Sequence, residues 1–179
     1  PFAYTLISDS VTMENGKRLP VCKAVLHFNT KKDEEVLVKV GVSAVDIAGA
    51  RKNVESEIPE WDFDKVRKDA RTAWNNYLSK IDITTSDKED KTIFYTALYH
   101  TAISPNLFTD ADGRYLGMDL EVHQGDTINP LYTVFSLWDT FRALHPLMTI
   151  IDPNLNNQFI NSLIRKHQEG GIYPMWDLA

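Results

Sequence analysis

The residue pattern most suited to binding or catalysis is Trp138-Asp139-x-x-Arg142, within the segment Phe135 to Pro146. On a helix, residues three apart face the same way, so Asp139 and Arg142 would share a face with Trp138 beside them. Sugars are bound by aromatic rings that cover their C–H faces and by charged side chains that hold vicinal hydroxyls. The three residues are therefore candidates for sugar binding. The structural alternative is a buried tryptophan beside a local ion pair.

Acidic residues in the segment that follows position 105 raise the question of calcium. Asp110 and Asp112 flank a tight turn, and Glu121 is the twelfth residue counted from Asp110. However, Gly113 is the fourth residue of this segment, whereas an EF-hand loop needs glycine at the sixth. The pattern favours a hairpin turn of the Asp-Gly type over a calcium loop.

The remaining candidates are weaker. The histidines 100, 123 and 145 lack the spacing of a metal site, which favours core or supporting roles. Trp176 and Asp177 repeat the Trp-Asp pair after a glycine turn. No glycine-rich phosphate loop, Gly-x-Ser-x-Gly elbow or Cys-x-x-Cys motif occurs, so nucleotide and acyl-transfer chemistry have no support.

Composition restricts the class of protein. The chain has 179 residues, 43% of them hydrophobic and 25% charged, as in globular proteins. A net charge of -6 and the lack of a basic stripe argue against general nucleic-acid binding. No apolar run approaches the roughly 20 residues of a membrane span. The single Cys22 excludes an internal disulfide.

The first 47 residues have the pattern of β-strands. Val21 to Phe28 and Glu35 to Val42 are rich in Val, Leu and Phe, which predicts two strands. Asn15-Gly16 predicts a tight turn before them. Two or three strands with open edges do not form a stable sheet alone. We therefore expect the tail of a β-sandwich whose other strands precede this chain.

Helices are predicted after a connector of small and charged residues, 48–59. The first runs from about Asp62 to Lys80, and the second begins at a capping box formed by Ser86 and Glu89 and ends before Pro105. A long non-helical stretch, 106–130, comes next, and loops of this length are usually functional.

Two further helices complete the predicted elements. One spans roughly 132–147, and the other starts at Asp152-Pro153 and ends at Gly170-Gly171. These helices carry more apolar stripes than they can bury against each other. With the chain's abrupt ends, this predicts a piece of a larger enzyme, with missing helices downstream.

Four sequence blocks resemble the calcium-dependent α-mannosidases of glycoside hydrolase family 92. The third block is specific, and the other three are weak singly. In chain order, the blocks are Tyr95-Thr96-Ala97-Leu98-Tyr99-His100-Thr101 with Ser104-Pro105-Asn106, then Asp110 to Gly117, then Tyr132 to Arg142 with His145-Pro146-Leu147, and finally Gly170-Gly171 with Pro174 and Trp176. The resemblance spans about residues 60–179.

The resemblance implies an α+β multidomain arrangement. Residues 1–47 would end an antiparallel β-sandwich, 48–83 would form a linker with a helix, and 84–179 would begin an incomplete (α/α)6 barrel. It further implies an exo-acting, inverting, α-1,2-mannosidase-like enzyme that trims mannose from N-glycans or mannan.

The same resemblance implies which parts of the active site this chain carries. Trp138 and Asp139 would contact the terminal mannose, and Arg142 would orient Asp139. The catalytic acid, the catalytic base and the calcium ligands would lie outside this chain. The implied location is periplasmic, cell-surface or secreted. The partners would be a mannose-containing glycan and the remainder of the polypeptide.

Two alternatives to the mannosidase remain open at this point. One is another (α/α)6-barrel carbohydrate-active enzyme that also carries a β-sandwich in front. The other is a carbohydrate-binding module without catalysis.

Overall fold

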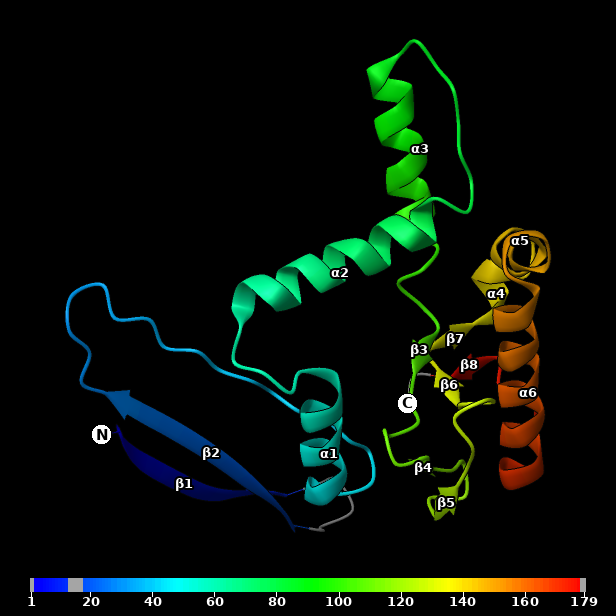
Figure 1. The fold of residues 1–179 in the computed structure, drawn as a ribbon. Coiled ribbons are helices and arrows are strands. Elements are labelled where there is room, and N and C mark those ends of the chain that lie inside the picture. Colours follow the sequence, from blue (N-terminus) through cyan, green and yellow to red (C-terminus); the bar gives the residue numbers. More distant parts are fainter. Residues whose placement is uncertain (1, 13–17, 178–179) are drawn as a thin grey trace. The chain divides into compact units, whose positions relative to one another are not determined.

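The computed structural model describes residues 2–12 and 18–177, with side chains from residue 25 onwards. The chain divides into two compact units, Pro1–Val38 and Lys39–Ala179, which are considered separately below. Figure 1 gives the element labels.

The first unit contains a long two-stranded antiparallel sheet. Strand β1 (Phe2–Thr12) pairs with β2 (Arg18–Phe28) in a register that runs from Phe2 opposite Phe28 to Thr12 opposite Arg18. The strand predicted over Val21 to Phe28 is thus confirmed as part of β2. The turn predicted at Asn15-Gly16 lies outside the described residues.

The strand predicted over residues 35–42 is wrong, because the chain there has no regular secondary structure. Its alternating valines are exposed, with Val38 at 67% and Val40 at 76%. Alternation predicts a strand only where a neighbour supplies the ladder hydrogen bonds, and no described segment pairs with this one. Part of the segment is instead attached to the next helix, because Asn53 Nδ2 donates to the Val42 carbonyl at 2.9 Å.

Most of the predicted connector at 48–59 forms helix α1 (Ile47–Glu57), which the sequence reasoning did not predict. Asp46 caps the helix by accepting a hydrogen bond from the Gly49 amide at 2.6 Å. This N-cap was a usable sequence signal. Gly49 is buried against the Asp110 carboxylate, where a Cβ atom would clash, so glycine allows the close approach.

Helix α2 (Phe63–Leu78) confirms the first predicted helix, with Asp62 as its N-cap. Helix α3 (Lys88–His100) confirms the second, but the predicted capping box at Ser86 is wrong. Asp87 caps α3 instead, by accepting from the Glu89 amide at 2.7 Å.

The stretch after α3 is non-helical, as predicted. It contains the short strands β3 (Asn106–Leu107), β4 (Arg114–Leu116) and β5 (Val122–Gln124). Strands β4 and β5 form an antiparallel hairpin, with Tyr115 opposite His123.

The helix predicted over 132–147 is broken into four elements. Strands β6 (Tyr132–Thr133) and β7 (Phe135–Ser136) precede two short helices, α4 (Leu137–Thr140) and α5 (Leu144–Ile151). Aromatic and β-branched residues favour strands where partners exist, and distant segments supply those partners. Pro146 lacks the amide that a continuous helix would need there, but it is tolerated in the first turn of α5.

Helix α6 (Pro153–Gly170) confirms the last predicted helix. Asp152 caps its start by accepting from the Leu155 amide at 3.1 Å, and Gly171 ends it in a left-handed conformation, φ 78°. The chain then returns as strand β8 (Trp176–Asp177) to pair with β7.

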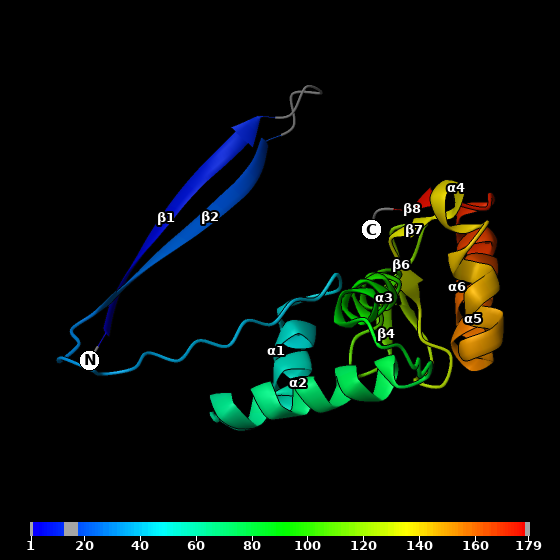
Figure 2. The same ribbon diagram turned by 90° about the horizontal axis from the view of Figure 1, so that it is seen from above.

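The core of the second unit lies where α5, α6 and β7 meet. Phe135, Met148 and Phe159 are almost fully buried there, and the Phe135 and Phe159 rings meet edge to face at 5.8 Å. Figures 1 and 2 both show β7, β8 and α4 side by side next to α5 and α6. The core therefore supports the segment that carries Trp138 and Asp139.

Candidate functional site

Trp138 and Asp139 stand on the short helix α4, and both are exposed, Trp138 at 69%. The Asp139 carboxylate accepts a short hydrogen bond from the Ser136 hydroxyl. Arg142 lies beyond the end of α4, and its guanidinium sits 5.1 Å from the centre of the Phe141 ring. Among the described residues, no ion pair joins Asp139 to Arg142. Ser136, which sequence reasoning missed, is therefore the side chain that holds Asp139 here.

Strands β7 and β8 determine which side chains share a face with Asp139. Phe135 is paired with Asp177, and Ser136 with Trp176. Directly opposed residues of an antiparallel pair point to the same side of the sheet, and successive residues alternate. Accordingly Phe135 and Asp177 are buried, at 0% and 5%, whereas Trp176 is 56% exposed. The pairing brings the second Trp-Asp motif next to the first, although 38 positions separate Trp138 from Trp176 in the printed sequence.

The turn between β6 and β7 is strained. Val134 adopts a φ of 62°, which is rare for a β-branched residue. It redirects the chain so that β6 pairs with β3 while β7 pairs with β8. Such strain is on the order of 1–3 kcal/mol per residue and is concentrated at functional sites. The strain therefore adds to the case for this segment as a site.

Asp177 forms a buried ion pair with a lysine of α6. Lys166 Nζ lies 2.7 Å from Asp177 Oδ2, and the two side chains are 3% and 4% exposed. The Thr133 hydroxyl donates to the same oxygen at 3.2 Å. The ion pair therefore attaches β8 to α6, and the hydrogen bond from Thr133 attaches β8 to β6. The role of Asp177 in this structure is thus internal, unlike that of Asp139.

Two of the three residues considered for calcium, Asp110 and Asp112, are engaged by protein donors. Asp110 is 5% exposed and accepts from Ser43 Oγ at 2.6 Å and from Asn53 Nδ2 at 2.8 Å. Asp112 is bound by Lys52 Nζ at 2.9 Å and by Arg114 Nε at 3.0 Å. Hydroxyl, amide and cationic donors thus bind the oxygens of Asp110 and Asp112.

The geometry of the 110–114 segment is that of a hairpin turn. The Gly113 amide donates to the Asp110 carbonyl at 2.8 Å, and Gly113 has a φ of 85°. The Asp110 amide donates to the Arg114 carbonyl at 2.8 Å, which completes a three-residue hairpin connection. The hairpin turn predicted for this segment is therefore confirmed. No group of three or more His, Cys, Asp or Glu side chains suited to a metal occurs in the part of the chain that the structure describes.

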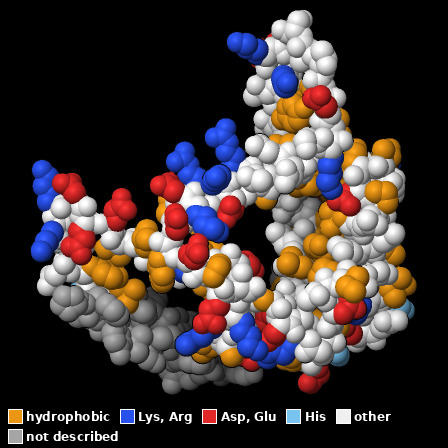
Figure 3. Space-filling view, in the orientation of Figure 1, with side chains coloured by type: hydrophobic (Ala, Val, Ile, Leu, Met, Phe, Trp, Pro, Cys, Tyr) orange, Lys and Arg blue, Asp and Glu red, His pale blue; other side chains and the backbone are white. Residues whose placement is uncertain are grey.

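Mixed charges gather around α1 and this turn, as Figure 3 shows in blue and red. Arg114 also binds Asp46 at 2.8 Å, so one guanidinium joins the N-cap of α1 to the turn. The hydrogen bond from Lys52, followed by the contacts with Arg114, lowers the pKa of Asp112 to about 2, against the opposing effect of burial. This cluster attaches α1 to the loop, and sequence spacing gave no sign of it.

The three histidines lie in different settings. His123 Nε2 is 2.9 Å from Asp119 Oδ2, and this hydrogen bond raises the pKa of His123. His145 is half-buried, which lowers its pKa, and its Nε2 lies 3.0 Å from the Thr140 hydroxyl. His100 is exposed at the end of α3, so the core role considered for it does not hold in this structure.

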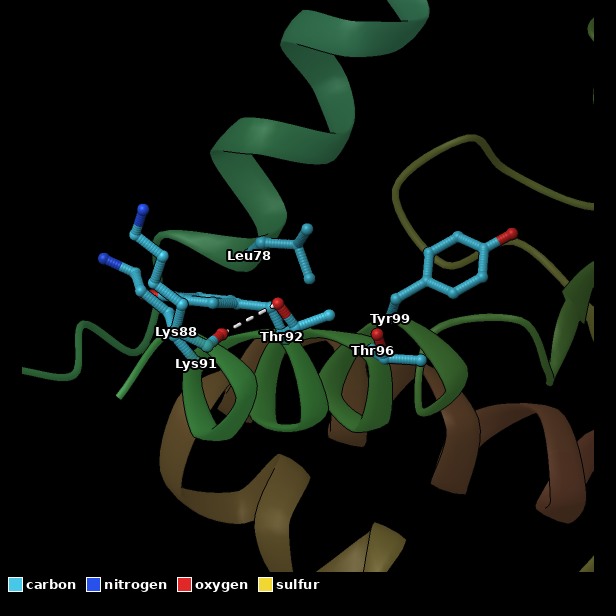
Figure 4. Close-up of a pocket in the computed structure, with 7 residues that line it drawn as sticks. Leu78, Lys88, Lys91, Thr92, Thr96 and Tyr99 are labelled. Atoms are coloured by element: carbon cyan, nitrogen blue, oxygen red, sulfur yellow. Dashed lines mark hydrogen bonds between the residues drawn. The ribbon is translucent and has the colours of Figure 1, made fainter. Parts of the chain in front are cut away.

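A surface hollow of about 570 Å³ lies between the end of α2 and α3, and none of the Trp-Asp residues lines it. Figure 4 shows Lys88 and Lys91 on one side of it and Tyr99 on the other. The Thr92 hydroxyl donates back to the Lys88 carbonyl at 2.9 Å. The hollow has no carboxylate among its lining residues, so it lacks the groups of a glycosidase centre.

No helix within the described residues is both long and apolar enough to cross a membrane.

Solved structures resemble this chain over most of its length. An α-mannosidase of family GH92 from Bacteroides thetaiotaomicron is 30% identical, with a TM-score of 0.72 over 91% of this chain and 19% of that chain. An inverting family GH92 mannosidase from Bacteroides thetaiotaomicron VPI-5482 is 28% identical, with a TM-score of 0.76 over 98% of this chain and 25% of that one.

A curated relative adds sequence similarity. An uncharacterized secreted glycosidase of Arthroderma benhamiae is 35% identical over 105 residues, which cover 50% of this chain and 14% of the relative. The chain thus spans a quarter or less of the length of each of these proteins. Residues 49–179 match the model of the glycosyl hydrolase family 92 catalytic domain. Because that match covers most of the chain, the chain belongs to glycosyl hydrolase family 92.

Proposed function

We propose that this chain is part of an exo-acting, inverting α-mannosidase, α-1,2-mannosidase-like, that trims mannose from N-glycans or mannan. The observation that carries the proposal is the match of residues 49–179 to a catalytic domain. It favours a glycosidase over a binding module without catalysis. One structural neighbour is itself an inverting mannosidase, which supports the stereochemistry.

In this proposal Trp138 and Asp139 bind the terminal mannose, and Arg142 lies nearby as a further contact to the substrate. The exposed indole would cover the C–H face of the sugar. Asp139 would accept hydrogen bonds from hydroxyls, with the Ser136 hydroxyl fixing one carboxylate oxygen. Charged acceptors make shorter and stronger hydrogen bonds than neutral ones, so Asp139 would contribute much of the binding free energy for the sugar.

Inversion needs a general acid and a general base about 6.5–9.5 Å apart, with a water between the base and the sugar. We assign neither group to a residue of this chain. Calcium, implied by the family resemblance, would likewise be held by residues outside this chain.

The proposed architecture follows the same resemblance. Residues 1–47 would end a β-sandwich, and 84–179 would begin an (α/α)6 barrel. Residues 48–83 would form the linker, with a helix, between these two domains. Large apolar side chains stay exposed in the structure, such as Ile150 at 78% and Leu120 at 78%. We expect them to pack against the remainder of the longer protein.

We also propose a periplasmic, cell-surface or secreted location. The similarity of part of this chain to the secreted glycosidase of Arthroderma benhamiae supports this location.

The test is hydrolysis of α-linked mannobiosides by the full-length protein, followed by NMR. An inverting enzyme releases β-mannose first, whereas a retaining one releases α-mannose. We expect turnover with β-mannose as the first product and loss of turnover after chelation of calcium. Release of α-mannose, or cleavage of glucosides alone, would refute the proposal.

A further inference from the structure

Helix α4 carries Trp138 and Asp139 but is only about one turn long. Its residues, Leu137–Thr140, begin without a side-chain hydrogen bond at the N-cap. A helix this short is not stable by itself in water, so contacts with other elements must hold it in place. The packing of Leu137 against the core is one such contact. Hydrogen bonds at Thr140, the last residue of the helix, are another.

The Thr140 hydroxyl contacts two polar groups. It lies 2.9 Å from the Ser136 carbonyl oxygen and 3.0 Å from His145 Nε2. A hydroxyl has one proton and a carbonyl oxygen can only accept, so the Thr140 proton goes to Ser136. The imidazole must then donate from Nε2 to the Thr140 oxygen. The direction of both hydrogen bonds thus follows from the chemistry of the three groups.

His145 has a fixed position at the start of α5. Its ring is half-buried and meets the buried Phe159 ring of α6 edge to face at 6.2 Å. Burial lowers the pKa of His145, so the ring is neutral near pH 7 and carries a proton on only one nitrogen. The geometry at Thr140 requires that this nitrogen is Nε2.

Three consecutive hydrogen bonds therefore lead from the core to the Asp139 carboxylate. His145 Nε2 donates to Thr140, the Thr140 hydroxyl donates to the Ser136 carbonyl, and the Ser136 hydroxyl donates to Asp139. We propose that Thr140 and His145 are positioning residues that hold Ser136, and through it Asp139, in the orientation that binds the sugar. This inference rests on the proposed function and adds to it two residues that act without touching the substrate.

The first test is kinetic and uses the full-length protein with an α-mannoside. Thr140→Val keeps the shape and removes the hydroxyl, so it should lower kcat/KM by about tenfold, because a displaced carboxylate misaligns the bound sugar. Thr140→Ser keeps the hydroxyl and should stay within about threefold.

Thr72→Val is the matched control for Thr140→Val. The Thr72 hydroxyl also donates to the carbonyl four residues earlier, that of Lys68, at 3.0 Å, and Thr72 is exposed on α2. This substitution should leave kcat/KM within about twofold, as expected for an exposed position outside the site. An equal loss in both threonine variants would overturn the inference.

A double-mutant cycle separates positioning from a general loss of stability. In the Asp139→Ala background, Thr140→Val should change kcat/KM by less than about twofold, because the carboxylate that Thr140 positions is gone. Residues that act independently would instead show effects that multiply. A further loss of about tenfold in the Asp139→Ala background would therefore overturn the inference.

A measurement on the unmodified protein keeps the inference testable if Thr140→Val does not fold. The histidines are labelled with ¹⁵N, and the His145 signals are assigned by their loss in His145→Gln. We expect a neutral ring with its proton on Nε2 at pH 8. A proton on Nδ1 would mean that Nε2 accepts the Thr140 proton, which breaks the chain to Ser136 and overturns the inference.

The outcomes separate this inference from the proposed function. If α-mannosides are cleaved and Thr140→Val changes only the melting temperature, the inference fails and the function stands. If the unmodified protein cleaves no α-mannoside, the function fails before any variant is made, and the inference that rests on it fails too.

Discussion

At the scale of single residues, Asp139 combines exposure with a fixed orientation. It is solvent-exposed, yet the Ser136 hydroxyl holds one of its carboxylate oxygens. A carboxylate prepared in this way can accept hydrogen bonds from a ligand without a large loss of side-chain entropy. The ion pair with Arg142 expected from their spacing is not needed for this arrangement.

We predict that Asp139→Asn in the full-length protein lowers kcat/KM by about ten- to a hundredfold. A hydrogen bond to a charged group contributes about 1.5–3 kcal/mol, and each 1.4 kcal/mol is a factor of ten. Asparagine keeps the shape and removes the charge, so stability should change little. Steady-state kinetics and thermal melting provide the measurement.

The control for this prediction is Asp69→Asn, which removes a carboxylate that is 62% exposed and pairs with Lys65 on α2. It should leave kcat/KM within about twofold, as expected for a surface pair. If Asp139→Asn also stays within twofold but lowers the melting temperature sharply, Asp139 has a structural role and the site assignment is wrong.

Asp112 leads to a prediction about pH. Its pKa is lowered from 3.8 to about 2, first by the hydrogen bond from Lys52. A depressed pKa in the folded state stabilises the protein above the unfolded value near 4, and this contribution is lost as the pH falls toward 2. Asp112→Asn should therefore lower the melting temperature near neutral pH.

The expected signature is a difference between wild type and Asp112→Asn that shrinks between about pH 4 and pH 2, measured by thermal unfolding at several pH values. Glu55→Gln, on the exposed side of α1 and outside the charge cluster, is the control and should show a smaller difference. A difference for Asp112→Asn that is constant with pH would show that the carboxylate charge does not matter.

At the scale of elements, local signals predicted α2, α3 and α6 well. Each combines an apolar stripe with an aspartate cap at residue 62, 87 or 152, although the cap of α3 was assigned one residue too early. The stripe and the cap of each helix lie close together in the chain, so the local sequence is enough to predict these three helices.

The strands β6 and β7, which sequence reasoning missed, depend on distant partners. Strand β7 exists because β8 arrives some 40 residues later, and β6 because β3 precedes it by 25 or so. The same holds for the site, since Trp138 and Asp139 were identifiable as a motif but the Ser136–Trp176 pairing was not. Conversely, the valines of 35–42 had strand periodicity without a partner.

The Lys166–Asp177 pair provides a prediction at this scale. Lys166→Met should destabilise the protein by about 3–5 kcal/mol, because it leaves the Asp177 charge buried and uncompensated. The double variant Lys166→Met, Asp177→Leu should recover much of that loss, since apolar residues of similar size often replace a buried pair without penalty. Urea unfolding of the full-length protein measures the difference.

Lys65→Met is the matched control for the buried pair. Its partner Asp69 is 3.0 Å away, but both side chains are more than half exposed, so the expected effect is about 0–1 kcal/mol. Equal effects of the two lysine substitutions would contradict a special role for the buried pair.

At the scale of the whole molecule, few of the described side chains form a closed core. Six hydrophobic residues are buried in the described structure, while large apolar residues such as Ile47, at 83%, remain exposed. Orange patches on the surface in Figure 3 show the same imbalance. A chain that spans 19% and 25% of its structural neighbours would leave such faces to be covered by the rest of the protein.

This comparison leads to the last prediction: the isolated chain of residues 1–179 has no glycosidase activity. Inverting hydrolysis needs two carboxyl groups about 6.5–9.5 Å apart around the scissile bond, and we assign neither to these residues. The isolated chain and the full-length protein should be assayed side by side on an α-mannoside, with and without calcium. Circular dichroism of the isolated chain reports whether its helices form.

Calcium-dependent turnover by the isolated chain, well above background, would mean that the acid and base lie within it after all. The nearest exposed carboxylate of the Trp-Asp segment, Asp139, would then have to be tested as one of the two.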